Sequence, residues 1–397
     1  MSAFRSTGNL IFSVLIALVL SQCTGDVSVP REVEWTFHLN DSTQFSIPGT
    51  YATNALSFLN GPDELSAEWS DADTAYILEA FDGHFSGKWV DEEFTGFWWD
   101  RLRTGEYKVP MSGRMKDGQI RWVKVLENQA TTQWSFHLPA SDSIPMGILL
   151  LQEHSSKLQG TIATSTGDLR YLTGEISPSG IWSLGTFDGA HLYQLIGQQI
   201  GNQWMGVFYS GTHYANEFRA VPSQDTTTIQ PHSATLLNDV PFSMKYISPD
   251  GDSLFLDANQ LPAEVTVIDL MGTWCPNCLD EIQLLKQLQS DYPDVGFLSA
   301  AFERNAEPVE AYERIAQYKQ ALSIPWEVLL CGPASKTVAR SCFPMLSQVK
   351  SFPTTLFVHR DGRMIAHSGF NGPATGSAYD AEVSVFTNNI ETLLHRP

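Results

Sequence analysis

Two cysteines three positions apart, Cys275 and Cys278, are the residues of this chain best suited to chemistry. They follow the apolar run Val265–Met271 and open a helical pattern that continues to about Tyr292. Side chains three apart at the start of a helix lie on one face, within reach of a disulfide bond. Unpaired backbone N–H groups and the positive end of the helix dipole favour thiolate over thiol at Cys275, which we expect to be the nucleophile. A strand, a CxxC motif and a helix together predict a redox-active dithiol.

A CxxC pair is also half of a zinc site, and this is the alternative for the two cysteines. The sequence holds no second CxxC, and none of His359, His367 and His395 has tight ligand spacing to Cys278. The spacing therefore predicts neither a metal nor another cofactor.

The rest of the C-terminal third alternates between apolar runs and helical patterns. The sequence predicts strands at 295–301 and 326–330, helices at 309–322, 335–346 and 383–394, and two strands within 351–365 that are joined by an Asp-Gly turn. Alternating strands and helices followed by a hairpin and a helix indicate a central sheet that is covered on both faces.

With these motifs in place, residues 236–397 resemble the thioredoxin superfamily, specifically the extracytoplasmic TlpA/ResA-like thiol–disulfide oxidoreductases. The resemblance rests on Trp274–Cys278, on Glu281 three residues later and on Phe352-Pro353-Thr354. It implies an α/β thioredoxin fold for the C-terminal domain. It also implies a cis bond at Pro353, which otherwise reads as a proline at the start of a strand.

The resemblance further implies how the site works. Cys275 attacks a substrate disulfide and Cys278 resolves the mixed disulfide, while a substrate backbone lies on Trp274 and Pro353 and next to the intervening Pro276 and Asn277. These two intervening residues replace the Gly-Pro of reducing thioredoxins, so the direction of electron flow stays open. An upstream electron-donor protein and protein thiol or disulfide substrates are the implied partners.

Two acids near the motif have open roles. Asp269, six residues before Cys275, matches the buried acid of thioredoxins and is the candidate proton acceptor for Cys278. The alternative is that it pairs with a lysine or with water at the end of a strand. Glu281 is a possible modulator of the site, or an ordinary first-turn acid that complements the helix dipole.

The N-terminus predicts export. Residues 1–22 carry one cation, Arg5, and an apolar core that is short for a membrane span, as in a secretory signal peptide. Leu20-Ser21-Gln22-Cys23 resembles a bacterial lipoprotein processing box, which predicts a lipid anchor on Cys23; a plain signal peptide is the alternative. We therefore expect an exported, lipid-anchored protein on the periplasmic or cell-envelope face of a bacterial membrane.

Composition agrees with an exported protein. There are 44 acidic and 24 basic side chains, and the resulting formal charge of −20 argues against nucleic-acid partners. At 397 residues, two domains are expected. Besides Cys23 and the CxxC pair, the chain has Cys331 and Cys342, which form either a second disulfide or two buried free thiols.

Residues 24–222 form a cysteine-free segment of a different kind. Nine of the eleven tryptophans lie there, in short apolar runs separated by turn residues, which predicts a single all-β domain, an antiparallel sandwich or barrel. Phe81-Asp82-Gly83 and Phe187-Asp188-Gly189 form a loose internal echo that suggests two related halves. The role of this domain is open, and the polar segment 223–235 is predicted to be a linker.

Three functional classes follow. The first is a membrane-anchored thiol–disulfide oxidoreductase that reduces exported proteins. The second is a binding protein that acts through an exposed aromatic patch of the β-domain. The third is a thioredoxin-fold peroxidase, which the sequence disfavours: peroxiredoxins have a threonine where this chain has Gly272, and a lone peroxidatic cysteine where Cys278 follows at once here.

Overall fold

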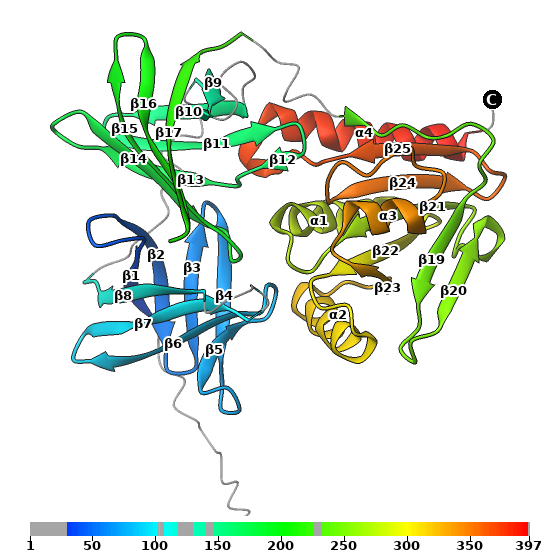
Figure 1. Cartoon of the computed structure of the whole chain (residues 1–397), viewed down its shortest axis with the longest axis horizontal. Coiled ribbons are helices and arrows are strands. Elements are labelled where there is room, and N and C mark those ends of the chain that lie inside the picture. Colours follow the sequence, from blue (N-terminus) through cyan, green and yellow to red (C-terminus); the bar gives the residue numbers. More distant parts are fainter. Residues whose placement is uncertain are drawn as a thin grey trace, which may run out of the picture.

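The computed structural model describes residues 30–101, 103, 107–117, 130–139, 146–224 and 232–395. The predicted signal peptide 1–22 and the lipidation site Cys23 lie outside these ranges. In Figure 1 the β-rich N-terminal half stands beside a C-terminal α/β domain.

The first eight strands close into an antiparallel barrel. They are β1 (Arg31–His38), β2 (Gln44–Ala52), β3 (Ala55–Asn60), β4 (Asp63–Ser70), β5 (Ala75–Leu78), β6 (Gly83–Val90), β7 (Glu93–Asp100) and β8 (Lys108–Met115). Each strand pairs with the next, and β1 pairs with β8. Alternate residues point inward, so Val33, Trp35 and Phe37 of β1 are all fully buried.

A second barrel follows with the same path. Its strands are β9 (Thr132–His137), β10 (Gly147–His154), β11 (Lys157–Thr164), β13 (Leu172–Ile176), β14 (Ile181–Phe187), β15 (Leu192–Ile200), β16 (Gln203–Ser210) and β17 (Tyr214–Pro222). They pair in this order, and β17 returns to β9. The two-residue strand β12 (Gly167–Asp168) extends from β11 on the side of the α/β domain (Figure 1).

The prediction of one sandwich or barrel is therefore corrected to two barrels. The echoed Phe-Asp-Gly tripeptides occupy equivalent connections, β5–β6 in the first barrel and β14–β15 in the second. A closer repeat opens both barrels: Trp35-Thr36-Phe37-His38-Leu39 and Trp134-Ser135-Phe136-His137-Leu138. This second repeat was the sequence signal that could have indicated two barrels in advance.

Large side chains fill both interiors. The first barrel holds Trp35, Phe58 and Trp98, and Phe187 at the end of β14 also packs into it, with ring centroids of Phe37 and Phe187 4.9 Å apart. The second barrel is filled by residues such as Phe136, Leu149, Trp182, Leu195 and Phe218. Trp35, Trp98 and Trp182 therefore build the barrel cores, and Phe187 of the second barrel belongs to the core of the first.

The C-terminal domain contains a six-stranded sheet in the order β18-β25-β24-β21-β22-β23. These strands are β18 (His232–Ser233), β21 (Val265–Met271), β22 (Gly296–Glu303), β23 (Glu327–Pro333), β24 (Thr354–His359) and β25 (Met364–Ser368). The helices are α1 (Pro276–Asp291), α2 (Pro308–Leu322), α3 (Lys336–Cys342) and α4 (Ser377–Leu394). A separate hairpin, β19 (Ser243–Ile247) and β20 (Ser253–Asp257), precedes β21, and short 3-10 turns span Ala258–Gln260 and Pro373–Thr375.

Strand β21 runs parallel to β22 and antiparallel to β24, which forms a hairpin with β25. This arrangement, with the CxxC motif directly after β21, is that of a thioredoxin fold with β23 and its flanking helices added at one edge. The elements predicted from sequence are present, with shifted ends. Helix α3 stops at Cys342 instead of about 346, because Pro344 disfavours helical geometry at Phe343.

The predicted linker 223–235 also differs in part from the structure. Its residues His232 and Ser233 form β18 and pair with Ser368 and His367 of β25, so the end of the segment belongs to the sheet. An edge strand of two residues leaves no periodicity that could have been read in the sequence.

Candidate active site

The cysteine pair lies at the junction of β21 and α1. Helix α1 begins at Pro276, and Cys275 is its N-cap, with extended backbone angles. Cys275 Sγ accepts a hydrogen bond from the Cys278 N–H (3.2 Å), and the two cysteines form a disulfide. Cys278 is fully buried, while Cys275 is 5% exposed. The structure thus shows the oxidised dithiol, with the first cysteine at the positive end of a helix.

A network of hydrogen bonds holds the loop that leads into the motif. Glu303, at the end of β22, accepts from the N–H of Thr273 (3.0 Å) and from its hydroxyl (2.7 Å). Trp274 Nε1 donates to the carbonyl of Phe302 (2.9 Å). Burial raises the pKa of the Glu303 carboxyl. The neighbouring parallel strand therefore fixes the loop on which Cys275 stands.

A cis-proline loop lies against the motif. The Phe352–Pro353 peptide bond is cis. The carbonyl oxygen of Phe352 lies 3.6 Å from Cys275 Sγ, and the Phe352 ring meets the Trp274 ring edge-on at 5.8 Å. The structure therefore brings Trp274, Pro353 and both cysteines together.

Two carboxyl groups are buried on the α1 side of the sheet. Asp269 and Glu281 are both fully buried, and Glu281 accepts a hydrogen bond from the Thr355 hydroxyl. Burial raises the pKa of Asp269 to about 7. Burial, and then the Asp269 carboxyl, raise the pKa of Glu281 well above its usual value. Glu281 is therefore not a first-turn surface acid, because it lies in the second turn of α1 and points into the core.

The remaining two cysteines are separate. Cys331 and Cys342 are buried free thiols, and the Cys342 thiol contacts the Cys331 carbonyl oxygen at 3.3 Å. Burial, and then Cys342, raise the pKa of Cys331 well above its usual value, so its thiol stays protonated and unreactive. The second-disulfide alternative is not the state found here.

Sequence reasoning missed the groups that the barrels bring to the motif. Arg304, after β22, lies 5.4 Å from the centre of the Trp274 ring and donates to Asp100 of the first barrel (2.7 Å). In the orientation that satisfies both amide atoms, Asn277 accepts from the N–H of Asp168 (2.9 Å) and donates to its carbonyl (3.2 Å). No local signal in the sequence places Asp100 next to Arg304 or Asp168 next to Asn277.

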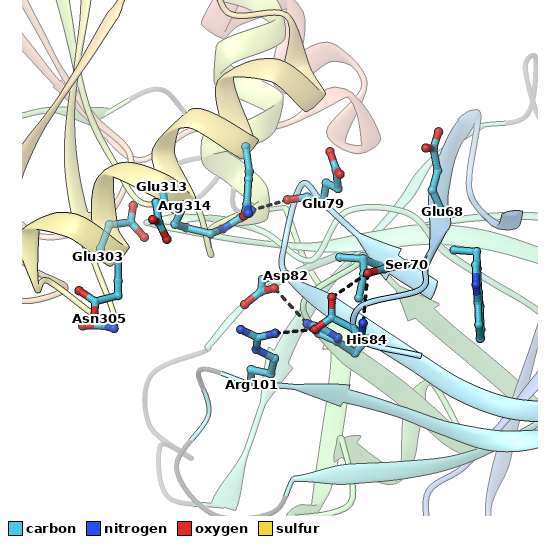
Figure 2. A pocket seen from close by; sticks show the side chains of 15 residues that line it. Glu68, Ser70, Glu79, Asp82, His84, Arg101, Glu303, Asn305, Glu313 and Arg314 are labelled. Atoms are coloured by element: carbon cyan, nitrogen blue, oxygen red, sulfur yellow. Dashed lines mark hydrogen bonds and ion pairs between the residues drawn. The ribbon is translucent and has the colours of Figure 1, made fainter. Parts of the chain in front are cut away.

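Figure 2 shows a hollow of about 420 Å³ between the first barrel and α2. Arg314 of α2 donates to the main-chain carbonyls of Glu79 (2.5 Å) and Ala80 (2.6 Å). Glu303, which holds the motif loop, lines the same hollow together with His84, whose Nε2 lies 3.1 Å from Asp82. The first barrel is therefore connected to the loop of the active site through buried and half-buried polar groups.

The solved structures that resemble this chain cover about two-fifths of it, for example 38% and 40%. No protein-family model and no curated protein matches the chain. A thioredoxin-like protein from Aeropyrum pernix is 14% identical over 38% of this chain and 89% of its own, with a TM-score of 0.28. A secreted disulfide oxidoreductase of Mycobacterium tuberculosis, homologous to E. coli DsbE, is 19% identical over 38% and 95%, with a TM-score of 0.27.

A thiol:disulfide interchange protein of the thioredoxin family from Chlorobium tepidum TLS is 16% identical over 40% of this chain and 100% of its own, with a TM-score of 0.29. At identities and TM-scores this low, the likeness carries no argument about substrate or direction of electron flow. The chemistry of this chain has to be argued from the geometry of its own cysteine site.

Proposed function

We propose that this chain is an exported thiol–disulfide oxidoreductase that reduces disulfides in other exported proteins. One observation carries the proposal: Cys275 caps α1, is bonded to Cys278 and lies beside the cis bond of Pro353. A helix N-terminus stabilises a thiolate, and a second thiol one turn away can displace a bound substrate.

The exchange begins from the reduced dithiol. The Cys275 thiolate attacks one sulfur of a substrate disulfide; the Cys275–substrate bond forms, the substrate disulfide breaks, and its other sulfur leaves as a thiolate that takes a proton. Cys278 then loses its proton and attacks Cys275, which forms the observed disulfide and releases the second substrate thiolate. Two electrons pass to the substrate, and a dithiol protein must supply two more to restore the starting state.

Asp269 is the proposed proton acceptor for Cys278. Its pKa of about 7, raised by burial, suits a group that takes and returns a proton near neutral pH. Glu281, three residues after Cys278 on the same face of α1, is the proposed modulator, because a second carboxyl beside Asp269 disfavours the ionisation of both.

We place the protein on the periplasmic or cell-envelope face of a bacterial membrane, held by a lipid on Cys23. The signal-like segment and its cysteine support this placement. Among the helices in the described part of the chain, none has the length and apolar character to cross a bilayer.

The first experiment measures the reduction potential of the Cys275–Cys278 pair in the mature protein by equilibration in redox buffers and alkylation. A reduction potential of about −270 mV supports a reductase, whereas one of about −120 mV would mean that the protein oxidises its substrates. In a variant with Cys331 and Cys342 replaced by serine, the measured alkylation comes from the Cys275–Cys278 pair. A pair that never forms a disulfide in solution overturns the proposal.

A trapping experiment assigns the two sulfurs. Cys278→Ser is expected to accumulate mixed disulfides with substrate proteins, because the resolving thiol is gone, and Cys275→Ser is expected to accumulate none. Equal trapping by both variants contradicts the assigned order of attack.

A further inference from the structure

The nucleophilic cysteine lies in a two-walled cavity. A space of about 480 Å³ opens at Cys275, which keeps 5% of its surface exposed. One wall consists of Trp274, Cys275 and Phe352 of the α/β domain, and the other of Thr164–Leu169 with Tyr193 of the second barrel. A group that reacts with Cys275 therefore has to enter between two different parts of the molecule.

The barrel wall touches the motif through its main chain. Asn277, between the two cysteines, exchanges hydrogen bonds with both main-chain groups of Asp168 in β12. Gly167 makes this approach possible: its φ is +143°, and a Cβ there would lie 2.6 Å from a terminal atom of the Asn277 side-chain amide. At Gly369 (φ +79°) a Cβ would lie 3.1 Å from main-chain atoms of Thr166. Two glycines thus allow the wall to stand in direct backbone contact with the active-site domain.

A buried ion pair fixes the wall in place. Arg170, just after β12, is 2% exposed and donates from Nε (3.0 Å) and Nη2 (2.8 Å) to Asp280 of α1, two residues after Cys278. Its Nη2 also reaches Asp63 of the first barrel (2.7 Å). A bidentate arginine–carboxylate pair sets geometry as well as attraction. The second barrel is therefore anchored to the helix that carries the cysteines.

Both walls offer groups that suit an extended polypeptide. Thr164, Ser165 and Thr166 line one side and Ser351 with Phe352 the other. The Ser351 residue is buried and the Thr164 hydroxyl donates to the Gly167 carbonyl (2.7 Å), whereas Ser165 is exposed, so Ser165 is the hydroxyl that the barrel side presents to an incoming chain. An extended segment can satisfy its main-chain groups between two such edges, as in strand addition. Because Cys275 is 5% exposed and lies between the two walls, a disulfide on the surface of a folded domain has to pass the barrel wall to reach it.

We propose that the second barrel forms one wall of the substrate groove and restricts the site to disulfides carried on extended or unfolded polypeptide segments. This inference rests on the proposed function and names its substrate class. The exchange itself is the one written above: the substrate disulfide is reduced, and the Cys275–Cys278 disulfide forms.

The test compares two forms of one substrate. A small domain with a single surface disulfide is used in its native form and as a variant that a core substitution keeps unfolded, so both carry the same disulfide. The reduced full-length protein should reduce the unfolded form at least about tenfold faster, which corresponds to about 1.4 kcal/mol in the barrier. Rates within twofold of each other overturn the inference.

Variants of the wall sharpen the test. Gly167→Val drives a side chain into the Asn277 amide and should raise the rate for the native substrate severalfold. Gly180→Val is the matched control: Gly180 also has positive φ (+79°), but a Cβ there meets no atom within 4 Å. An unchanged rate ratio in a folded Gly167→Val protein contradicts the inference; if that variant does not fold, the wild-type comparison still decides.

A small probe separates the two proposals. Bis(2-hydroxyethyl) disulfide is small enough to enter the cavity, so the wild-type protein and the Gly180→Val control should reduce it at similar rates. If the protein reduces this probe but reduces the native and the unfolded substrate at similar rates, the role of the barrel wall is rejected and the oxidoreductase function stands. No reduction of any disulfide rejects the proposed function itself.

Discussion

At the scale of single residues, the most consequential feature is the pair of buried acids beneath the motif. Asp269 and Glu281 are fully buried, and the hydroxyl of Ser299 (3.4 Å from Asp269) is among their few polar contacts. No lysine or arginine pairs with Asp269 in the described structure, so the alternative of a lysine partner is not realised there. Ionisation of both of two adjacent buried carboxyls is unfavourable because their negative charges repel, so the pair retains a proton at neutral pH.

The proposed role of Asp269 as proton acceptor predicts the pH dependence of turnover. Above pH 7 the Asp269 carboxyl is ionised and can accept the proton of Cys278, so the rate of resolution should rise as the pH passes through about 7. Asp269→Asn should lose this rise and slow resolution by about 10²-fold. Stopped-flow measurement of the rate at which the Cys275–Cys278 disulfide forms tests this expectation. The control is Asp291→Asn, because Asp291 is an exposed acid at the other end of α1. An equal loss of rate in this variant would contradict the role of Asp269.

The same carboxyl predicts the pH dependence of stability. Burial raises the pKa of Asp269 above its value in the unfolded chain, so the folded state binds the proton more tightly between about pH 4 and 7. Its contribution is fully present below about pH 4 and is lost as the pH rises through 7. Asp269→Asn should therefore flatten the decline in stability over this range. Denaturant unfolding at pH 4.5 and pH 7.5 measures the difference, and parallel profiles for both proteins contradict the prediction.

At the scale of elements, the repeat that opens both barrels places its tryptophan in two different environments. Trp35 of β1 is fully buried, and its Nε1 donates to the Ser57 carbonyl of β3 (2.8 Å). Trp134, its counterpart in β9, is partly exposed and donates to the Thr132 hydroxyl (3.0 Å). The same residue type thus lies inside one barrel and packs, partly exposed, against the edge of the core in the other.

This difference predicts unequal effects of one substitution. Trp35→Phe leaves the Ser57 carbonyl without its indole donor inside the barrel, and we expect it to lower the free energy of unfolding by about 1–3 kcal/mol. Trp134→Phe should cost less than about 0.5 kcal/mol, as is usual near the surface. Unfolding in guanidinium, followed by tryptophan fluorescence and circular dichroism, measures both. Equal losses would show that the two tryptophans have equivalent environments.

At the scale of the whole molecule, one arginine joins three parts of the chain. Arg170 of the second barrel binds Asp280 of α1 and Asp63 of the first barrel. Burial raises the pKa of Asp280 to about 6 although the Arg170 guanidinium opposes this shift. Burial, and then Asp280, raise the pKa of Asp168 to about 7. The ion pair of Arg170 with Asp280 between the second barrel and the active-site helix is therefore buried and dependent on complete pairing.

This dependence predicts non-additive substitutions. Arg170→Met leaves the Asp280 carboxyl buried and unpaired, which should cost about 3–5 kcal/mol, and the added change Asp280→Leu should recover a large part of it. Thermal unfolding at pH 7.5, where the carboxyl tends to ionise, measures both proteins. Arg114→Met, which breaks an exposed pair with Glu93, is the control and should change little. Additive losses in the double variant contradict a coupled pair.

How much of this molecule follows from sequence depends on the range of the interaction concerned. The CxxC motif, its helix, the strands that flank it and the turn before β25 are set by neighbours a few residues apart, so periodicity and turn chemistry predict them. The burial of Glu281 was not predicted, because whether a helical side chain is buried depends on how the sheet packs against the helix. Cys331 and Cys342 were left open because thiol geometry depends on how α3 meets β23.

The amino-acid sequence by itself therefore determined a dithiol on a thioredoxin-like domain and a tryptophan-rich β-segment before it. The tertiary structure alone decided that this segment closes twice into barrels, and that the second barrel places Asp168 and Arg170 against Asn277 and Asp280. Those residues are about 110 positions apart in sequence. Barrel closure and domain docking are decided by pairing and packing between distant segments, and no local pattern of residues records which distant partner a strand edge or a buried charge will meet.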